Sequence, residues 1–234
     1  MSVTEVTPYE IPWQESLNVS WEGGHPVLRA SSENRHPDVG GLLPTGYDAY
    51  VRLFHPFVSQ TAVSAHKPLA PAASWAELAD RAGVAFGPTL TLRQLRPALA
   101  GLPDLFVDEG YLEEFAASAL FDVLDDDQGG PWLFAFGLAG WVIAGRPRLF
   151  SATSLDDRLT VAELSEVGDA GSPEYVWPAD QRWIVCTGRD LTSTYLAVPQ
   201  NVAERLLTHP TLEAIEVRPE TRVDDRADES GLST

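Results

Sequence analysis

Apolar residues recur with helical spacing most clearly between residues 109 and 124. They follow the i, i+3, i+4, i+7 pattern of an amphipathic helix that buries one face. Asp108 stands at the N-cap position, and Glu109 and the acids after it favour the N-terminal end through the helix dipole. The pattern predicts a helix from Glu109 to Leu124. Its buried face would consist of Leu112, Phe115, Ala116, Ala119, Leu120, Val123 and Leu124.

Shorter helices are predicted from their capping residues. Ser74 and Glu77 have the spacing of a capping box, and Gly83 stands where glycine commonly ends a helix. A less regular helical pattern contains Pro97, and Pro199 occupies a position that favours the start of another helix. The three predicted helices cover residues 74–83, 91–100 and 199–208.

Strands are predicted where aromatic and β-branched residues cluster between turn residues. Residues 46–57 form one such strand, which Pro56 ends. Residues 132–145 are apolar throughout and predict two buried strands joined by a tight turn at Ala139-Gly140. Further short strands are predicted at residues 17–21, 27–30, 148–151, 182–187, 194–198 and 212–217.

The regular strand–helix alternation of a doubly wound fold is missing from this pattern. The sequence therefore predicts an α+β fold, a mostly antiparallel sheet with a few packed helices, as a single domain over residues 1–217. Residues 218–234 are polar and predict a disordered acidic C-terminal tail.

Composition fits a folded protein of this size. Of 234 residues, 44% are hydrophobic, including seven tryptophans, which is enough to form a substantial core. No apolar run approaches the roughly 20 residues of a membrane-spanning helix, and the polar N-terminus differs from a signal peptide. Cys186 is the single cysteine, so an intramolecular disulfide is excluded. We therefore expect a cytoplasmic protein.

Charge is the most informative property of the chain. The net charge is −18, and no lysine or arginine occurs between Arg96 and Arg146, where nine acids lie. A negative field repels nucleic acid and anionic membranes and attracts basic partners. We expect a basic protein partner, no nucleic acid and no membrane, with the oligomeric state left open. The predicted partner-binding residues are Glu113, Glu114, Asp122, Asp125, Asp126 and Asp127.

The run Asp125–Asp127 is also a candidate for a hard cation, which prefers oxygen ligands. The alternate spacing and the twelfth-position glutamate of a calcium loop are absent, and adjacent acids on a helix turn point in different directions. A solvated helix end is the simpler interpretation. The five histidines have no metal-ligand spacing, so we predict no metal and no cofactor.

Aromatic and polar residues are densest between residues 172 and 197. They could line a small-molecule pocket, or the rings could be core and Asp190 could cap a turn. Cys186 lies in a predicted strand, which favours a buried and inert thiol. No catalytic motif is recognisable. The candidate pocket residues are Tyr175, Trp177, Asp180, Arg182, Trp183, Asp190 and Tyr195.

Two resemblances to known families rest on short motifs. Residues 43–56 read LPTGYDAYVRLFHP, residues 177–183 read WPADQRW, and residues 190–195 read DLTSTY. Together these motifs resemble a family of uncharacterised proteins from high-GC bacteria, which implies no activity. The LP-x-x-Y start and the acidic balance resemble, over less of the chain, the SMI1/KNR4-like (SUKH) proteins, which implies an immunity-like role against a toxin.

The leading hypothesis from the sequence is a non-catalytic acidic protein-interaction module, immunity-like as the second resemblance implies. One alternative is a small-molecule-binding domain or undescribed enzyme that uses the aromatic pocket. Another is a structural subunit of a larger assembly, with the aromatic-rich region as its interface.

Overall fold

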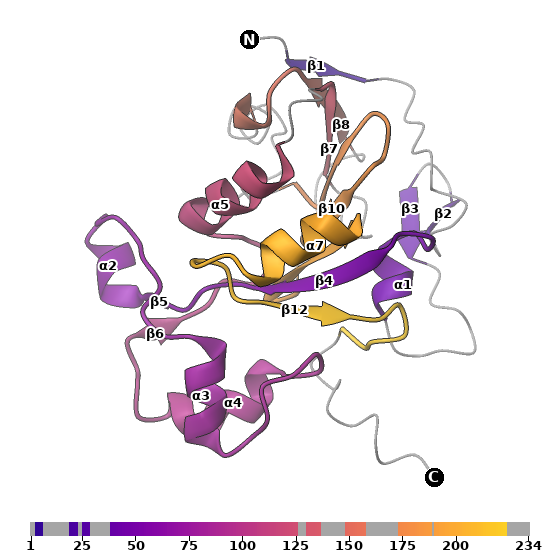
Figure 1. Cartoon of the computed structure of the whole chain (residues 1–234). Coiled ribbons are helices and arrows are strands. Elements are labelled where there is room, and N and C mark those ends of the chain that lie inside the picture. Colours follow the sequence, from indigo (N-terminus) through magenta and orange to yellow (C-terminus); the bar gives the residue numbers. More distant parts are fainter. Residues whose placement is uncertain are drawn as a thin grey trace.

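The computed structural model describes residues 3–6, 19–22, 25–28, 38–125, 130–136, 148–157, 173–188 and 190–223. They form an α+β fold around one large sheet (Figure 1). Every pair of neighbouring strands in this sheet is antiparallel. In sheet order the strands are β1 (Val3–Glu5), β8 (Arg148–Ala152), β7 (Trp132–Phe136), β9 (Tyr175–Pro178), β10 (Ile184–Cys186), β11 (Ser193–Val198), β4 (Ala49–Phe54) and β12 (Ala214–Val217).

Two short antiparallel strand pairs and the helices complete the described structure. Strand β2 (Val19–Glu22) pairs with β3 (His25–Leu28), and β5 (Val58–Ser59) pairs with β6 (Leu105–Phe106). The helices are α1 (Val39–Leu42), α2 (Gln60–Ser64), α3 (Trp75–Ala82), α4 (Leu92–Leu99), α5 (Glu114–Leu124), α7 (Gln200–Leu207) and the 3-10 helix η1 (Leu155–Asp157).

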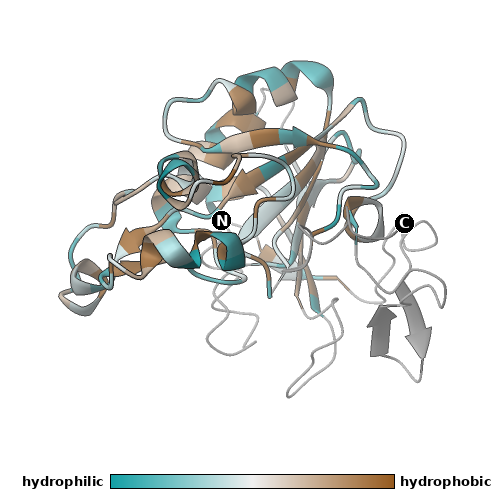
Figure 2. Cartoon of the chain, turned by 90° about the horizontal axis from the view of Figure 1, so that it is seen from below, coloured by the Kyte–Doolittle hydropathy of each residue, from teal (hydrophilic) through white to brown (hydrophobic). Residues whose placement is uncertain are grey.

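Alternation along the strands sends side chains to two covered faces of the sheet. On one face, Val51 and Leu53 of β4 pack in the same core cluster as Leu120 of α5 and Leu206 of α7. On the other face, side chains from β4, β9 and β11 pack with Val39 of α1. Apolar residues accordingly concentrate on the strands, and hydrophilic residues lie on the outer helix surfaces (Figure 2). The two faces are separate cores, so the face on which a strand residue lies decides what it can contact.

A third core lies beyond the end of β4, where α3 and α4 pack against each other (Figure 1). The ring of Trp75 lies 4.9 Å from that of Phe54 and 5.1 Å from that of Phe57, measured between centroids. Leu78 and Leu95 complete the buried contact between the two helices. We call α3 and α4 together the α3–α4 unit.

The three predicted short helices form as α3, α4 and α7, whereas α1 and α2 were not predicted. Both halves of the Ser74–Glu77 capping box form, and Gly83 follows α3 in the left-handed conformation. Helix α4 begins after its own capping box at Thr91 and continues through Pro97 to Leu99. Helix α7 begins directly after Pro199, as expected.

The predicted start of the long helix is wrong. Helix α5 begins at Glu114, five residues after the predicted start, and Asp108 does not cap it. The reason is a contact with a distant loop: Gly110 is in the left-handed conformation, and its N–H donates to the carbonyl of Leu191. Residues 109–113 are therefore not helical, and the chain bends at Glu109 and Gly110 before α5 begins. Phe115 and Ala119 are only partly buried, whereas Phe121 is buried.

The chain after residue 217 also differs from the prediction. Residues 218–223 lie against α1, because the amides of Val39 and Gly40 donate to the carbonyls of Thr221 and Pro219. Val223 is buried in the core cluster of that face. The predicted disorder is therefore wrong for residues 218–223, while residues 224–234 lie outside the described residues. The predicted turn at Ala139-Gly140 also lies outside the described residues. Strand β9 (Tyr175–Pro178) was not predicted.

Candidate functional site

Helix α5 carries a row of carboxylates on its exposed side. Glu114, Asp122 and Asp125 are exposed, and their spacing of eight and three residues places them on one side of the helix. Ser118 lies between them and donates to Glu114. The helix contains no lysine or arginine. We call Glu114, Asp122 and Asp125 the acidic face of α5.

Other predicted partner-binding residues are placed differently. Glu113 is only 6% exposed, so it does not belong to the acidic face of α5. Burial, and to a lesser extent the charge of Asp108, raises the pKa of its carboxyl. Glu113 precedes the helix, where its carbonyl accepts from the amides of Ala116 and Ala117. Asp126 and Asp127 lie outside the described residues.

Within the described part of the chain, no group of three histidine, cysteine, aspartate or glutamate side chains has metal-site geometry. Asp125 is the C-cap of α5, so the acidic run begins where the sequence placed it, at the helix C-terminus. The helix dipole disfavours an anion at this end. Asp125 therefore stands where its charge does not stabilise the helix.

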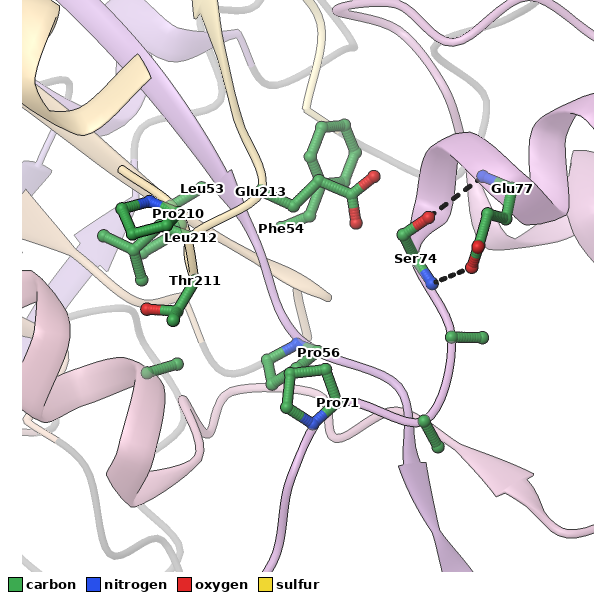
Figure 3. Close-up of a pocket in the computed structure, with 13 residues that line it drawn as sticks. Leu53, Phe54, Pro56, Pro71, Ser74, Glu77, Pro210, Thr211, Leu212 and Glu213 are labelled. Atoms are coloured by element: carbon green, nitrogen blue, oxygen red, sulfur yellow. Dashed lines mark hydrogen bonds between the residues drawn. The ribbon is translucent and has the colours of Figure 1, made fainter. Parts of the chain in front are cut away.

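A pocket of about 460 Å³ lies between α5 and the α3–α4 unit (Figure 3). Its walls come from the end of β4, the chain before α3, the first turn of α3, one residue of α5 and the loop before β12. Because three prolines line it, we call it the proline pocket. Its lining residues are Leu53, Phe54, Pro56, Pro71, Ala72, Ala73, Ser74, Glu77, Ala116, Pro210, Thr211, Leu212 and Glu213.

Two carboxylates give the proline pocket its charge. The two oxygens of half-buried Glu213 accept from the amides of Trp75 and Ala76, each at 2.7 Å, so Glu213 caps α3 from a distant loop. Burial raises the pKa of the Glu213 carboxyl, and the two N–H donors act in the opposite direction. Glu77 is exposed and belongs to the Ser74 capping box (Figure 3). None of the lining residues is basic.

The predicted aromatic pocket does not form, because its rings lie on opposite faces of the sheet. Tyr175, Trp177 and Tyr195 belong to the core that α1 covers. Trp183 belongs to the core that α5 covers and stacks on Trp132 at 5.4 Å. None of the four predicted rings is more than 3% exposed. The core interpretation of these rings is the one that fits the structure.

The polar residues predicted for that pocket lie in two loops, one between β9 and β10 and one before β11. Arg182 forms a 2.8 Å ion pair with Asp180 in the turn between β9 and β10. The guanidinium also lies 5.1 Å from the centre of the Trp132 ring. Asp190 is exposed in the loop before β11. Cys186 is 1% exposed, and burial raises the pKa of its thiol to about 12, which confirms the predicted buried thiol.

A buried polar network between β4 and β11 was not predicted. The side chain of His55 is fully buried, with Nδ1 2.9 Å from the carbonyl of Asp108 and Nε2 3.1 Å from Oγ1 of Thr194. Burial lowers the pKa of His55 to about 4, so the ring is neutral at pH 7. The carbonyl of His55 also accepts from Nε1 of Trp75. The network therefore ties the sheet to α3 and to the segment before α5.

Arg52 lies beside this network, nearly buried. Its Nε donates to Oγ of Ser193 and its Nη1 to the carbonyl of Pro88, both at 2.9 Å. The guanidinium lies 4.2 Å from the centre of the Phe54 ring. These contacts join β11 and the loop between α3 and α4 to β4, which indicates a structural role.

Comparisons with protein-family models, with curated proteins and with solved structures found no match. Among the described helices, none combines the length and the hydrophobicity needed to cross a bilayer.

Proposed function

We propose that this protein is a non-catalytic interaction module that binds a basic protein partner through the acidic face of α5. The observation that carries the proposal is the alignment of Glu114, Asp122 and Asp125 on one exposed side of a helix that has no basic residue. The opposite side of α5 is buried in the core, which holds the row in a fixed position. The resemblance to SUKH proteins supports an immunity-like role, with a toxin as the partner.

The length of the acidic face defines the kind of partner. Glu114 and Asp125 are about 16 Å apart along the helix axis, at 1.5 Å per residue. Salt screens exposed charges beyond about 8 Å at physiological ionic strength. The two ends of the row therefore act on different charges of the partner. The complementary surface is a row of basic residues of similar length rather than a single lysine or arginine.

Charge of this kind acts mainly on the rate of association. Complementary fields steer the encounter and select the partner, while exposed ion pairs contribute little affinity each. Association should therefore be fast at low salt and slow down steeply as salt is added.

The test begins with capture of the partner from the native lysate at low salt and its purification. Association rates are then measured over a series of salt concentrations for the wild type and for a variant with Glu114→Gln, Asp122→Asn and Asp125→Asn. A matched control carries Asp80→Asn, Glu216→Gln and Glu220→Gln, three exposed acids on other elements. Both variants change the net charge equally.

We expect the α5 variant to associate more slowly than the control and to show a flatter salt dependence. Equal rates and equal salt slopes in the two variants would show that only the total charge matters, which contradicts the placement of the site on α5.

A further inference from the structure

The proline pocket has the size and the walls of a ligand site. Its volume of about 460 Å³ falls within the range of roughly 300–1,000 Å³ that is usual for such sites. Pro56, Pro71 and Pro210 contribute walls without N–H donors and with a fixed φ angle, and Leu53 and Leu212 add aliphatic surface. Such walls suit an aliphatic chain, which needs no hydrogen-bond partners.

The polar part of the pocket is anionic. Glu77 and Glu213 line it, and no lining residue carries a positive charge. A ligand with a carboxylate or phosphate would be repelled, whereas a cation is attracted. The pocket therefore combines an apolar wall with a negative end, which matches an alkyl chain that ends in a positive charge.

Glu213 can accept further hydrogen bonds. Each of its two oxygens accepts one backbone N–H of α3. An ionised carboxylate offers about four lone-pair sites, so roughly half of its capacity remains for a ligand. A guanidinium is suited to such a carboxylate because its N–H groups form a planar fork with two parallel donors.

From these observations we infer that the proline pocket receives an arginine side chain of the basic partner. The inference rests on the proposed function, because Ala116 in the first turn of α5 lines the pocket, so the N-terminal end of the helix that carries Glu114 borders it. Ala116 lies on the opposite side of α5 from Glu114, so the arginine comes from a part of the partner that passes this end of the helix. The arginine stem packs on the prolines, and its guanidinium faces Glu213.

Two pairs of probes test the inference on the isolated protein. Acetyl-arginine amide is compared with acetyl-citrulline amide, which has the same shape but a neutral urea group. Butylguanidine is compared with N-butylurea in the same way. Dissociation constants are measured by calorimetry or ligand-observed NMR. We expect both guanidinium probes to bind at least tenfold more tightly than their neutral counterparts, about the effect of one charge-assisted hydrogen bond.

Variants locate the binding. Glu213→Gln should weaken acetyl-arginine amide on the order of tenfold, whereas Glu216→Gln, an equal charge change on an exposed residue outside the pocket, should have little effect. Since Glu213 also caps α3, a second variant, Ala72→Leu, narrows the pocket without changing charge and should weaken both guanidinium probes. Unfolding curves verify that each variant is folded.

Five results would overturn the inference. The first four are no measurable binding of acetyl-arginine amide at millimolar concentration, equal binding of the citrulline probe, equal loss of binding in Glu216→Gln, and unchanged binding in Ala72→Leu. A fifth is binding of butylguanidine alone, which would assign the pocket to a free guanidinium compound instead of a protein side chain.

The same probes separate the pocket from the acidic face of α5. The α5 triple variant retains every pocket residue, so it should bind acetyl-arginine amide nearly as the wild type does. If partner association is insensitive to the triple variant while the arginine probe still binds, the proposed function fails and the cation site stands. If the triple variant slows partner association while the arginine probe does not bind, the acidic face of α5 stands and the pocket is not a site.

Discussion

The pH dependence of stability gives a direct test of the buried polar network around His55. Burial lowers the pKa of this histidine from 6.5 to about 4 in the folded protein. Between these pH values the unfolded chain binds a proton at His55 and the folded chain does not. Stability therefore falls as the pH is lowered from 6.5 to 4. At about 1.4 kcal/mol for each pKa unit, the loss is about 3 kcal/mol.

Other buried groups act in the opposite direction, so His55 has to be isolated by a variant. The pKa values of Asp108, Glu113 and Glu213 are raised by burial. A raised carboxyl pKa gives stability at low pH that is lost as the pH rises. His55→Asn removes the titrating ring and keeps a side-chain amide that can hydrogen-bond in its place.

The assay is urea unfolding followed by tryptophan fluorescence at pH 4, 5, 6 and 7. We expect the wild type to lose about 3 kcal/mol more than His55→Asn between pH 7 and pH 4. His66→Asn, which changes an exposed histidine, is the control and should follow the wild type. Parallel pH profiles for the wild type and His55→Asn would refute the argument, because His55 would then titrate alike in both states.

Three further predictions concern the helices and the thiol. Leu120→Ala should lower the free energy of unfolding by about 3 kcal/mol, since Leu120 is 1% exposed between α5 and the sheet. Asp122→Ala, on the exposed side of the same helix, should change it by less than about 0.5 kcal/mol. Similar urea midpoints for the two variants would contradict the packing of α5. Ser74→Ala should cost about 1 kcal/mol by removing the N-cap of α3, and an unchanged midpoint would mean that Glu213 alone caps the helix. Cys186 should react with a thiol reagent only on unfolding, and rapid labelling of the native protein would contradict its burial.

What the sequence predicted well is fixed by neighbouring residues. The start of α3 follows from Ser74 and Glu77, three residues apart, and the end follows from Gly83. The core-facing pattern of α5 was recognisable for the same reason, since it is a periodicity within one segment. Its start was not, because the contact of Gly110 with Leu191 joins segments about 80 residues apart.

The candidate sites show the same limit. Glu114, Asp122 and Asp125 follow from helical spacing, whereas the burial of Glu113 depends on the way the chain enters α5. The proline pocket joins four separate segments of the chain, and Glu213 caps a helix that begins 138 residues earlier. For the aromatic pocket, the sequence did show that Tyr175 and Trp177 share one face of a strand, because they are two residues apart. It did not show that Trp183 lies on the opposite face of the sheet.

The position of β4 in the sheet has a consequence for synthesis of the chain. Both of its neighbours, β11 and β12, lie in the last part of the sequence, and the His55–Thr194 contact spans 139 residues. At 5–20 residues per second, a ribosome needs on the order of ten seconds to add that length. During this interval the apolar side chains of β4 have neither strand partner. The α3–α4 unit is local in sequence and can form in the meantime, beside a strand that is still open to chaperones.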